Sequence, residues 1–350
     1  MVRSLFDRAP FAFAQGRADF LLAAAVTRTC EIPGITQAGI PGQIPLTPVL
    51  DAEFLCTGRV YSLDDPAKTA SGIPTPGLLT RAVHELHPFA SLSVLDLGLE
   101  HAPRYCPTVS FGFTPTPSID KPESFDAEET FEAGLDFGRR YRLSGDFAVV
   151  GESTPGGTTT AQAAVGALGY DTAGHFASSF RHAPAALKAD TVRRALATVP
   201  PGAGTFARLG QTADRTLLFT AGFMLTASRR FPVVLGGGTQ MAAALLIADT
   251  LARQLRIAFD PRRLTLCTTR WIADDGASDI AALLRQLSFD VRACYADFLY
   301  TDATVPVLRR YDEGEAKEGV GAGAALAYGL GNGLSPAQIT ARVERLMGVA

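Results

Sequence analysis

Cysteine is scarce in this sequence, and the few cysteines present do not form pairs. The five cysteines among the 350 residues are Cys30, Cys56, Cys106, Cys267 and Cys294. Their number is odd, their spacing is wide and none belongs to a CxxC motif, so they predict neither a disulfide framework nor a zinc ribbon. Free cysteines of this kind are typical of a reducing compartment, and we expect a cytoplasmic protein.

A strong excess of charge of either sign is also absent. The chain has 32 basic and 35 acidic residues, which give a formal net charge of −3, and they do not form long runs of one sign. Binding to a nucleic-acid backbone usually needs a concentrated positive patch. Nucleic acid is therefore not an expected partner.

Long apolar runs are missing as well. Within residues 1–26, charged side chains such as Arg3, Asp7 and Arg17 interrupt the apolar core that an export signal requires. Elsewhere, apolar stretches such as residues 243–248 end well before the roughly 20 residues of a membrane span. We expect neither an export signal nor a membrane-inserted helix.

What the sequence does contain is an alternation of short apolar runs and alanine-rich segments. Hydrophobic residues make up 47% of the chain, whose length predicts about two domains at roughly 150 residues each. Strands are predicted over residues 93–98, 146–151, 231–236, 264–269 and 289–294, and helices over residues 128–142, 159–168, 188–198, 213–228, 239–255, 277–287 and 335–347. Residues 30–50 and 102–124, rich in proline, are predicted to be loops. Buried strands alternating with helices favour an α/β fold, with a doubly wound, mainly parallel sheet flanked by helices.

The segment VVGESTPGGTTTAQAA, residues 149–164, carries the clearest signal for a ligand site. A predicted strand ends at Gly151, Glu152 follows it, and Gly156 and Gly157 precede three threonines that open a helix. Ligands of parallel α/β sheets lie beyond the carboxyl ends of the strands, so Glu152 is expected to face the site. Backbone amides and hydroxyls at a helix N-terminus suit a phosphate. The alternative is an ordinary strand–turn–helix connection whose threonines only cap the helix.

A second loop of this kind, VLGGGTQMAA, joins a predicted strand to a helix through Gly236, Gly237 and Gly238. The glycines remove every Cβ from the turn and place Thr239 and Gln240 at the helix start. Tight packing of the helix on the sheet would also favour glycine there. No lysine follows and the glycines do not form GxGxxG, so neither an ATP nor an NAD site is predicted, and no cofactor is expected.

The third stretch, EGEAKEGVGAGAALA, combines carboxylates with alternating glycines before an alanine-rich helix. Gly319, Gly321 and Gly323 form the turn, and Glu318 directly precedes it. A carboxylate whose pKa is raised by burial or by a second carboxylate can act as a general base, which makes Glu318 a candidate. Acidic runs of this kind are more often solvated surface.

Motifs for several other reactions are absent. The sequence has no GxSxG, no HExxH and no cysteine with a convincing partner, which argues against hydrolase and metalloenzyme sites, and no metal site is predicted. Asp274, Asp275 and Asp279 follow a predicted strand and suit ribose hydroxyls, Mg²⁺ or the N-cap of the next helix. A magnesium-dependent phosphate-ester hydrolase or kinase is the weakest interpretation, since a phosphate-loop lysine is missing.

Taken in their order, the three loops resemble those of the nicotinate-nucleotide:dimethylbenzimidazole phosphoribosyltransferases, which build the lower ligand of cobalamin. GESTPGGTTTAQAA is similar to that family's GEMGIGNTT-type loop, PVVLGGGTQMAAALLIA to its strand–loop–helix, and KEGVGAGAALA to its C-terminal GEGxGAALA loop. SVLDLGLE is similar to its early strand. The likeness covers residues 90–330. The GGGTQM motif resembles that of a divergent archaeal and cyanobacterial-type branch of the family, and the first 90 residues resemble this branch alone.

The resemblance implies a set of site residues. Glu152 would lie in the active site, and the 5′-phosphate of a nucleotide would be held by Gly156, Gly157, Thr158, Thr159 and Lys188. The further binding candidates are Gly237, Gly238, Thr239, Gln240, Gly319 and Gly321. In that family a glutamate between the first two glycines of the C-terminal loop is the general base, and here that position is Val320. Either Glu318 takes over this role or Glu152 serves alone.

The activity implied is transfer of the ribosyl 5-phosphate of nicotinate mononucleotide to 5,6-dimethylbenzimidazole or a related aromatic base, with release of nicotinate. A carboxylate would stabilise the oxocarbenium-like transition state, and the acceptor must lose a proton. The family also implies a homodimer. Val320 permits an alternative, which is a non-catalytic homologue that binds a nucleotide or a base, or one that acts on a different base. We expect a large α/β nucleotide-binding domain over residues 90–310 and a smaller, mainly helical domain from residues 1–89 and 311–350.

Overall fold

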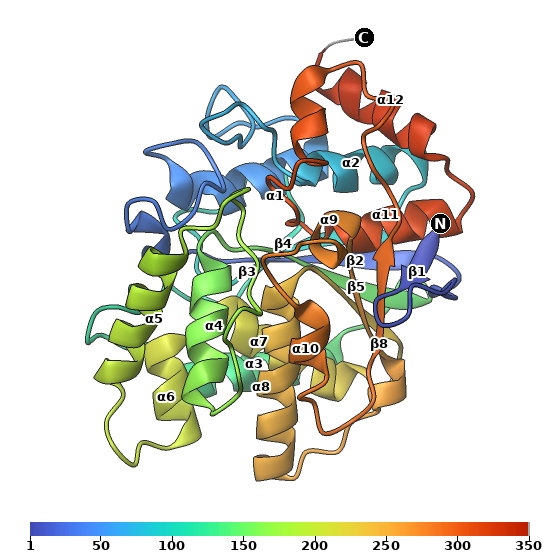
Figure 1. Ribbon diagram of the computed structural model, residues 1–350. Coiled ribbons are helices and arrows are strands. Elements are labelled where there is room, and N and C mark those ends of the chain that lie inside the picture. The colour runs from blue at the N-terminus through green and yellow to red at the C-terminus, as the bar shows by residue number, and fades with distance from the viewer. Residues whose placement is uncertain (349–350) are drawn as a thin grey trace.

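A single eight-stranded sheet forms the centre of the computed structural model, which describes residues 1–348 (Figure 1). The strands are β1 (Val2–Ser4), β2 (Ala18–Ala24), β3 (Ser91–Asp96), β4 (Thr108–Ser110), β5 (Phe147–Ser153), β6 (Val233–Gly236), β7 (Leu264–Thr269) and β8 (Arg292–Ala296). They lie in the order β1-β8-β7-β6-β5-β2-β3-β4, and all neighbours are parallel except β1 and β8. The α/β fold with a mainly parallel sheet is therefore confirmed.

Helices cover both faces of this sheet. One face carries α3 (Ala127–Arg140), α4 (Gly157–Ala167), α5 (Ala185–Thr198), α6 (Thr205–Thr212), α7 (Arg215–Ala227), α8 (Thr239–Leu255) and α10 (Ile280–Leu284). The other face carries α1 (Thr47–Thr57), α2 (Gly77–Leu86), α11 (Ala322–Gly331) and α12 (Pro336–Leu346). Figure 1 shows the first group below the sheet and the second above it. Short helices lie in the connections, namely η1 (Arg28–Glu31), η2 (Ile44–Leu46), η3 (Pro261–Arg263), α9 (Arg270–Ala273) and η4 (Pro306–Arg310).

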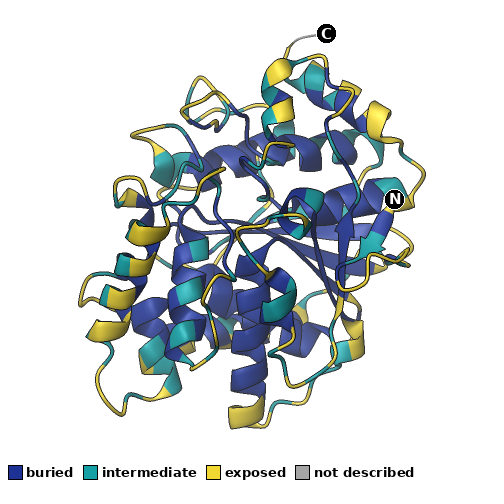
Figure 2. Cartoon of the chain, viewed as in Figure 1, coloured by how far each residue is buried: buried dark blue, intermediate teal, exposed yellow. Residues whose placement is uncertain are grey.

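Burial on both faces explains why the strands are apolar along their whole length. In β5, Ala148 and Val150 pack into one apolar cluster, whereas Phe147 and Val149 pack into the cluster on the opposite face. Successive side chains of a strand point to opposite faces, so a sheet covered twice needs apolar residues at every position. The two clusters are the dark blue layers on either side of the sheet (Figure 2). None of the helices within residues 1–348 has both the length and the apolar character that a membrane span needs.

The largest difference from the sequence prediction is β2, which was not anticipated. Its sequence, ADFLLAA, is rich in alanine and leucine, residues that favour helices, yet all of it is buried between β3 and β5. The two segments predicted as loops also contain regular structure, since residues 30–50 include η2 and the start of α1, and residues 102–124 include β4. By contrast, β7 and α8 have the predicted bounds.

The helices of the two terminal segments pack together above the sheet. Helix α2 contacts α1, α11 and α12. The strands β1 and β2 of the first segment, however, belong to the sheet and not to this helical group. The division of the chain into two domains therefore stays a prediction, and residues 1–89 are not mainly helical.

The direction of chain progression reverses between β2 and β5. From β2 the chain continues outward to β3 and β4, and from β5 it continues to β6, β7 and β8 on the other side. Such a reversal leaves a crevice at the carboxyl ends of the central strands, which is where open α/β sheets bind ligands. The topology therefore directs attention to the residues that follow β2, β5, β6 and β7.

Glycines allow α3 and α7 to approach each other closely. A Cβ added at Gly134 would overlap the carbonyl oxygen of Phe219, and one added at Gly222 would overlap that of Phe131. The backbones of the two helices are therefore in direct contact, without side chains between them. This contact joins α3 to α7 within the layer of helices below the sheet.

Gly222→Ala is expected to destabilise the protein by about 1–3 kcal/mol, because the added methyl group has no space between the two backbones. Gly166→Ala, in α4, is the matched control: its added Cβ would meet nothing closer than 3.7 Å. There the better helix propensity of alanine should leave stability unchanged or raise it by up to about 1 kcal/mol. Urea denaturation measures both, and equal effects of the two substitutions would contradict the close packing of α3 on α7.

Candidate active site

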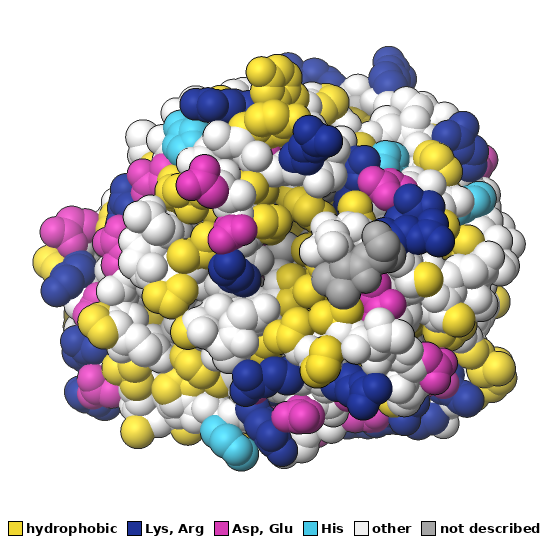
Figure 3. All heavy atoms as spheres, turned by 90° about the horizontal axis from the view of Figure 1, so that it is seen from above, with side chains coloured by type: hydrophobic (Ala, Val, Ile, Leu, Met, Phe, Trp, Pro, Cys, Tyr) yellow, Lys and Arg dark blue, Asp and Glu magenta, His cyan; other side chains and the backbone are white. Residues whose placement is uncertain are grey.

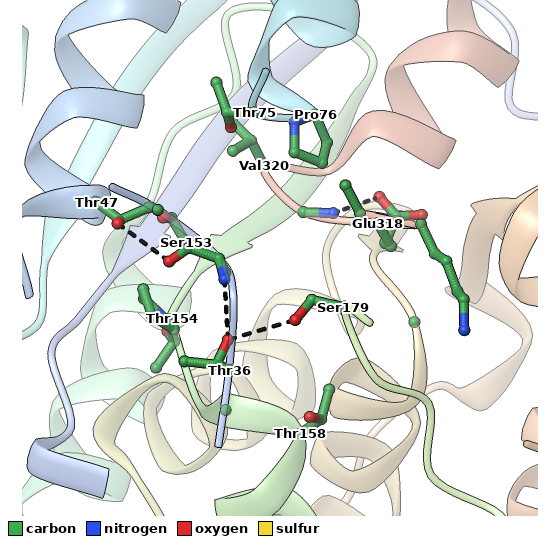
Figure 4. Close-up of a pocket in the computed structure, with 18 of the residues that line it drawn as sticks. Thr36, Thr47, Thr75, Pro76, Ser153, Thr154, Thr158, Ser179, Glu318 and Val320 are labelled. Carbon is green, nitrogen blue, oxygen red and sulfur yellow. Dashed lines mark hydrogen bonds between the residues drawn. The ribbon is translucent and has the colours of Figure 1, made fainter. Parts of the chain in front are cut away.

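A cavity lies beyond the carboxyl ends of β5, β6 and β7, where the topology predicts a ligand site. Its wall comes from residues in the segments 36–51, 67–76, 152–158, 177–179, 238–240 and 316–320, together with Ile272. Figure 4 shows polar side chains from several of these segments, including Thr36, Ser153 and Thr158, around one space. Seen from above, the outer surface of residues 1–348 differs from the cavity, because acidic and basic side chains are interspersed on it (Figure 3).

Glu152 lies near the end of β5 and lines the cavity. Its side chain is buried, and its Oε2 accepts a hydrogen bond from the backbone N–H of Thr154 at 3.1 Å. Burial raises the pKa of Glu152 to about 8, and the nearby carboxylates of Glu318, Asp214 and Asp51 add to this effect. With a single hydrogen-bond donor on its carboxylate within residues 1–348, Glu152 keeps acceptor capacity for a ligand.

Glu318 also lines the cavity, but donors surround its carboxylate. Oε2 accepts hydrogen bonds from the Thr268 hydroxyl at 3.2 Å and the Thr269 N–H at 2.9 Å. Oε1 accepts from the N–H groups of Gly319 and Gly323, at 3.2 and 3.1 Å. Burial raises the pKa of Glu318 to about 7, although these hydrogen bonds favour its charged form. The two bonds from Thr268 and Thr269 fasten the C-terminal loop to the end of β7, and the two from Gly319 and Gly323 hold the loop's own turn.

Val320 occupies a strained position between two glycines. Its φ angle is +53°, a left-handed conformation that costs a residue other than glycine about 1–2 kcal/mol. Its N–H donates to the carbonyl oxygen of Glu152 at 2.7 Å, and its own carbonyl accepts from the Thr80 hydroxyl at 2.8 Å. These two bonds hold the side chain of Val320 in the cavity wall, next to Pro76 and Thr75 (Figure 4).

The loop before α4 has the backbone that a bound anion needs. Gly156 has a φ of +82°, and a Cβ at Gly157 would overlap the side chain of Gln240. Gly156, Gly157 and Thr158 line the cavity, whereas Thr159 does not. The hydroxyl of Thr159 is buried and has no hydrogen-bond partner within residues 1–348. At the start of α4 the N–H groups of Gly157 and Thr159 donate to the carbonyls of Thr154 and Gly156, whereas the N–H of Thr158 has no partner among the described residues. That amide and the Thr158 hydroxyl are the groups that the helix start presents to the cavity.

Lys188 lies directly behind this loop. Its Nζ donates to the Thr158 hydroxyl at 3.0 Å and to the carbonyl of Ala177 at 2.9 Å. Burial lowers the pKa of Lys188 to about 8. Lys188 is not part of the cavity wall itself, and its connection to the wall is the bond to Thr158.

The loop before α8 contributes its helix start to the same cavity. Gly238, Thr239 and Gln240 line the wall, but Gly237 does not. A Cβ at Gly237 would meet Met241, so this glycine serves packing. The Gln240 side chain is buried, and its Nε2 has no partner within the described chain. An unpaired buried amide costs free energy, and a polar ligand in the cavity would relieve that cost.

In the C-terminal loop the predicted glycines have different roles. Gly319 lines the cavity, whereas Gly321 packs against the sheet. A Cβ at Gly321 would lie 3.0 Å from the Cα of Gly151 and 2.9 Å from the Phe20 ring. Gly321 is therefore required for close contact between the loop and β5.

Sequence reasoning missed three charged groups in the cavity wall, Asp51, Lys68 and Lys317. Lys317 is buried and pairs with Asp275 at 2.9 Å. It lies in an acidic run that looks like solvated surface, and Asp51 directly follows the segment 30–50 that was predicted to be a loop. The other candidate acids have structural roles, since Asp274 pairs with Arg8 and Arg270, and Asp279 caps α10. Over residues 1–348, no group of three or more metal-ligating side chains comes together.

Replacing Glu152 should flatten the dependence of stability on pH. Between the ordinary pKa of 4.5 and the value of about 8, the folded protein keeps a proton on Glu152 that the unfolded chain has released. The stability that this group contributes is therefore present at low pH and is lost as the pH rises through 8. Glutamine does not ionise. The free energy of unfolding, measured by urea titration, should therefore fall less in Glu152→Gln than in the wild type as the pH rises from about 5 to about 8.5. Glu128→Gln, on the exposed side of α3, should follow the wild type, and an unchanged profile in Glu152→Gln would contradict the raised pKa.

Comparison with known proteins gives relatives along nearly the whole chain. A family model described as phosphoribosyltransferase matches residues 87–259. UPF0284 proteins of Sulfolobus acidocaldarius and Archaeoglobus fulgidus are each 34% identical to this chain, over 95% of it and 94% of their own length. The UPF0284 protein of Halobacterium salinarum is 38% identical, over 88% of this chain and 91% of its own.

Solved structures share the fold. The crystal structure of CobT from Thermus thermophilus aligns with a TM-score of 0.56 and 21% identity, over 95% of this chain and 84% of that one. A nicotinate-nucleotide-dimethylbenzimidazole phosphoribosyltransferase from the same organism aligns with a TM-score of 0.56 and 20% identity, over 95% of this chain and 86% of that one. The chain belongs to the UPF0284 proteins, and its residues 87–259 match the phosphoribosyltransferase family model.

Proposed function

We propose that this protein transfers the ribosyl 5-phosphate group of nicotinate mononucleotide to 5,6-dimethylbenzimidazole or a related aromatic base, and releases nicotinate. The observation that carries the proposal is the position of Glu152. Its buried carboxylate lines the same cavity as the glycine-rich start of α4. A carboxylate and an anion site in one cavity match a substrate that carries a phosphate at one end and develops positive charge at the other.

The phosphate of the donor is assigned to the starts of α4 and α8. Both helices begin at the cavity wall, with Gly157 and Thr158 on one and Thr239 and Gln240 on the other. The N-terminus of a helix attracts anions through its free amides and its dipole. Lys188, bonded to Thr158, adds a positive charge behind the wall.

Glu152 is assigned to the charge on the ribose. As the bond between C1′ and the pyridine nitrogen breaks, positive charge builds up on the sugar, and a fixed carboxylate nearby stabilises it. The donor itself carries a positively charged pyridinium ring. Its binding beside Glu152 favours the ionised carboxylate, which offsets the raised pKa of the empty cavity.

Glu318 is assigned a different role from Glu152. Four donors occupy its two oxygens, which leaves little capacity to take a proton from a substrate. We assign it to holding Gly319 and Val320 in the cavity wall. Its effect on turnover is then indirect, through the shape of the C-terminal loop.

Glu152→Gln is expected to lower turnover by at least about 100-fold, because the neutral amide cannot stabilise the developing charge. The assay supplies nicotinate mononucleotide and 5,6-dimethylbenzimidazole and measures free nicotinate and ribazole phosphate by chromatography. Glu318→Gln should have a smaller effect, since an amide nitrogen would face the backbone N–H groups and loosen the loop. Glu128→Gln should equal the wild type.

The same assay distinguishes the alternative interpretation. A nucleotide-binding protein without activity would bind nicotinate mononucleotide in calorimetry and yield neither product. Wild-type rates in both Glu152→Gln and Glu318→Gln would contradict the assignment of this site.

A further inference from the structure

Asp51 is a buried carboxylate that the proposed function has not used. It lies on α1, is 3% exposed and lines the cavity. Its Oδ1 accepts a hydrogen bond from the Thr75 hydroxyl, and its Oδ2 accepts one from the Ser153 hydroxyl, both at 2.7 Å. Burying a carboxylate is costly, and two hydroxyl donors compensate only part of that cost. Its position in a ligand cavity therefore needs an explanation beyond packing.

The Ser153 hydroxyl is oriented by this bond. Because its proton points at Asp51, its lone pairs are free, and within residues 1–348 no donor bonds to them. Ser153 also lines the cavity, next to Glu152 in β5. Its hydroxyl can thus offer a hydrogen-bond acceptor to a ligand while it donates to the carboxylate of Asp51.

This pair lies beside the position where the resembling family has its base. The backbone carbonyl of Glu152, one residue before Ser153, holds the N–H of Val320. On the other side, a Cβ at Gly77 would lie 3.4 Å from both the Thr75 hydroxyl and the Val320 side chain. Asp51 is bonded to Thr75, which lies next to Val320 (Figure 4), and to Ser153, whose neighbour Glu152 holds the N–H of Val320.

The proposed transfer needs a group at this place. An imidazole-type base attacks with the lone pair of one ring nitrogen and must lose the proton on its other ring nitrogen. Val320 has no group to accept that proton, and the carboxylate of Glu318 is fully occupied. Glu152 is assigned to the charge on the ribose. One carboxylate of the cavity wall then remains, which is Asp51.

We propose, building on the proposed function, that Ser153 and Asp51 form a proton relay for the acceptor base. The attacking nitrogen forms its bond to C1′ while the bond from C1′ to the pyridine nitrogen breaks, and that electron pair stays on nicotinate. The proton of the other ring nitrogen passes to Ser153 Oγ as the Ser153 proton passes to Asp51 Oδ2. Asp51 later loses this proton to water. Asp51 acts through Ser153 and does not itself touch the base.

The charges around Asp51 are compatible with this role. Burial raises its pKa to about 6, while the bonds from Ser153 and Thr75 favour its charged form, so it is mostly ionised at neutral pH. The acidic groups that face it are Glu152 on β5 and the phenol of Tyr311 after η4, and Glu318 faces Glu152 from the C-terminal loop. On α2, Arg81 bonds to the carbonyls of Leu55 and Cys56 at the far end of α1.

The experiment compares two reactions of the same donor. In the first, the wild type and Asp51→Asn transfer ribosyl phosphate to 5,6-dimethylbenzimidazole. In the second, they exchange labelled nicotinate into nicotinate mononucleotide. In the exchange, the pyridine nitrogen of the labelled nicotinate attacks C1′ as the bond to the unlabelled nicotinate breaks. This nitrogen carries no proton, so exchange needs Glu152 but no relay. Asp51→Asn should lower transfer by at least about 100-fold and leave exchange within about threefold.

Three further variants separate the relay from a structural effect. Ser153→Ala should behave like Asp51→Asn, and Ser153→Thr, which keeps the hydroxyl, should restore most of the transfer. Glu53→Gln is the matched control, because Glu53 is a buried carboxylate on the same helix with its own four donors and lies outside the cavity wall. Its ratio of transfer to exchange should equal that of the wild type. Thermal unfolding checks that each variant is folded.

The outcomes distinguish this proposal from the one on which it rests. Suppose that the wild type catalyses both transfer and nicotinate exchange. If Asp51→Asn then loses both activities equally, or loses neither, the relay is overturned and the proposed function stands. A wild type that catalyses neither reaction overturns the proposed function and the relay together. Selective loss of transfer in Asp51→Asn and Ser153→Ala, with Glu53→Gln unaffected, supports the relay.

Discussion

The contact between the C-terminal loop and the sheet is the constraint on which the rest of the site depends. Gly321 lies against Gly151 of β5 and Gly236 of β6 with no side chain between the backbones. This close approach brings Glu318 within reach of the end of β7 and brings Val320 to the carbonyl of Glu152. A single Cβ at any of these glycines would move the loop outward and open the cavity.

The three carboxylates of the cavity differ mainly in how many donors surround them. Glu152 has one donor, Asp51 has two and Glu318 has four. Burial raises the pKa of all three, but each added hydrogen bond to the charged form opposes that effect. The donor count therefore underlies the roles proposed for them: Glu152 with one donor responds to substrate charge, Asp51 with two orients the Ser153 hydroxyl, and Glu318 with four holds the loop. Similar side chains acquire different chemistry from their surroundings.

The sequence predicted the parts of the fold that depend on local patterns. The strands β5 and β7 and the helix α8 have clear apolar periods and glycine boundaries, and the loop after β5 has the composition of a phosphate site. The central strand β2 was missed because its alanines and leucines favour a helix and only burial between two strands overrides that preference. The place of Asp51 in the cavity wall was missed for a different reason: its partner Ser153 is 102 positions away, and no periodicity reveals such a contact.

The distance along the chain between the walls of the cavity also affects when the site forms during synthesis. Thr80 is made early, yet its hydroxyl bonds to Val320, 240 positions later. A nascent chain from which residue 320 has not yet emerged from the ribosome already contains the starts of α4 and α8. It still lacks the part of the cavity wall that residues 316–320 form. Contacts of such long sequence separation form late in folding. The proposed anion site is therefore open in the unfinished chain, and the proposed reacting end of the cavity is enclosed only once the C-terminal loop has been made.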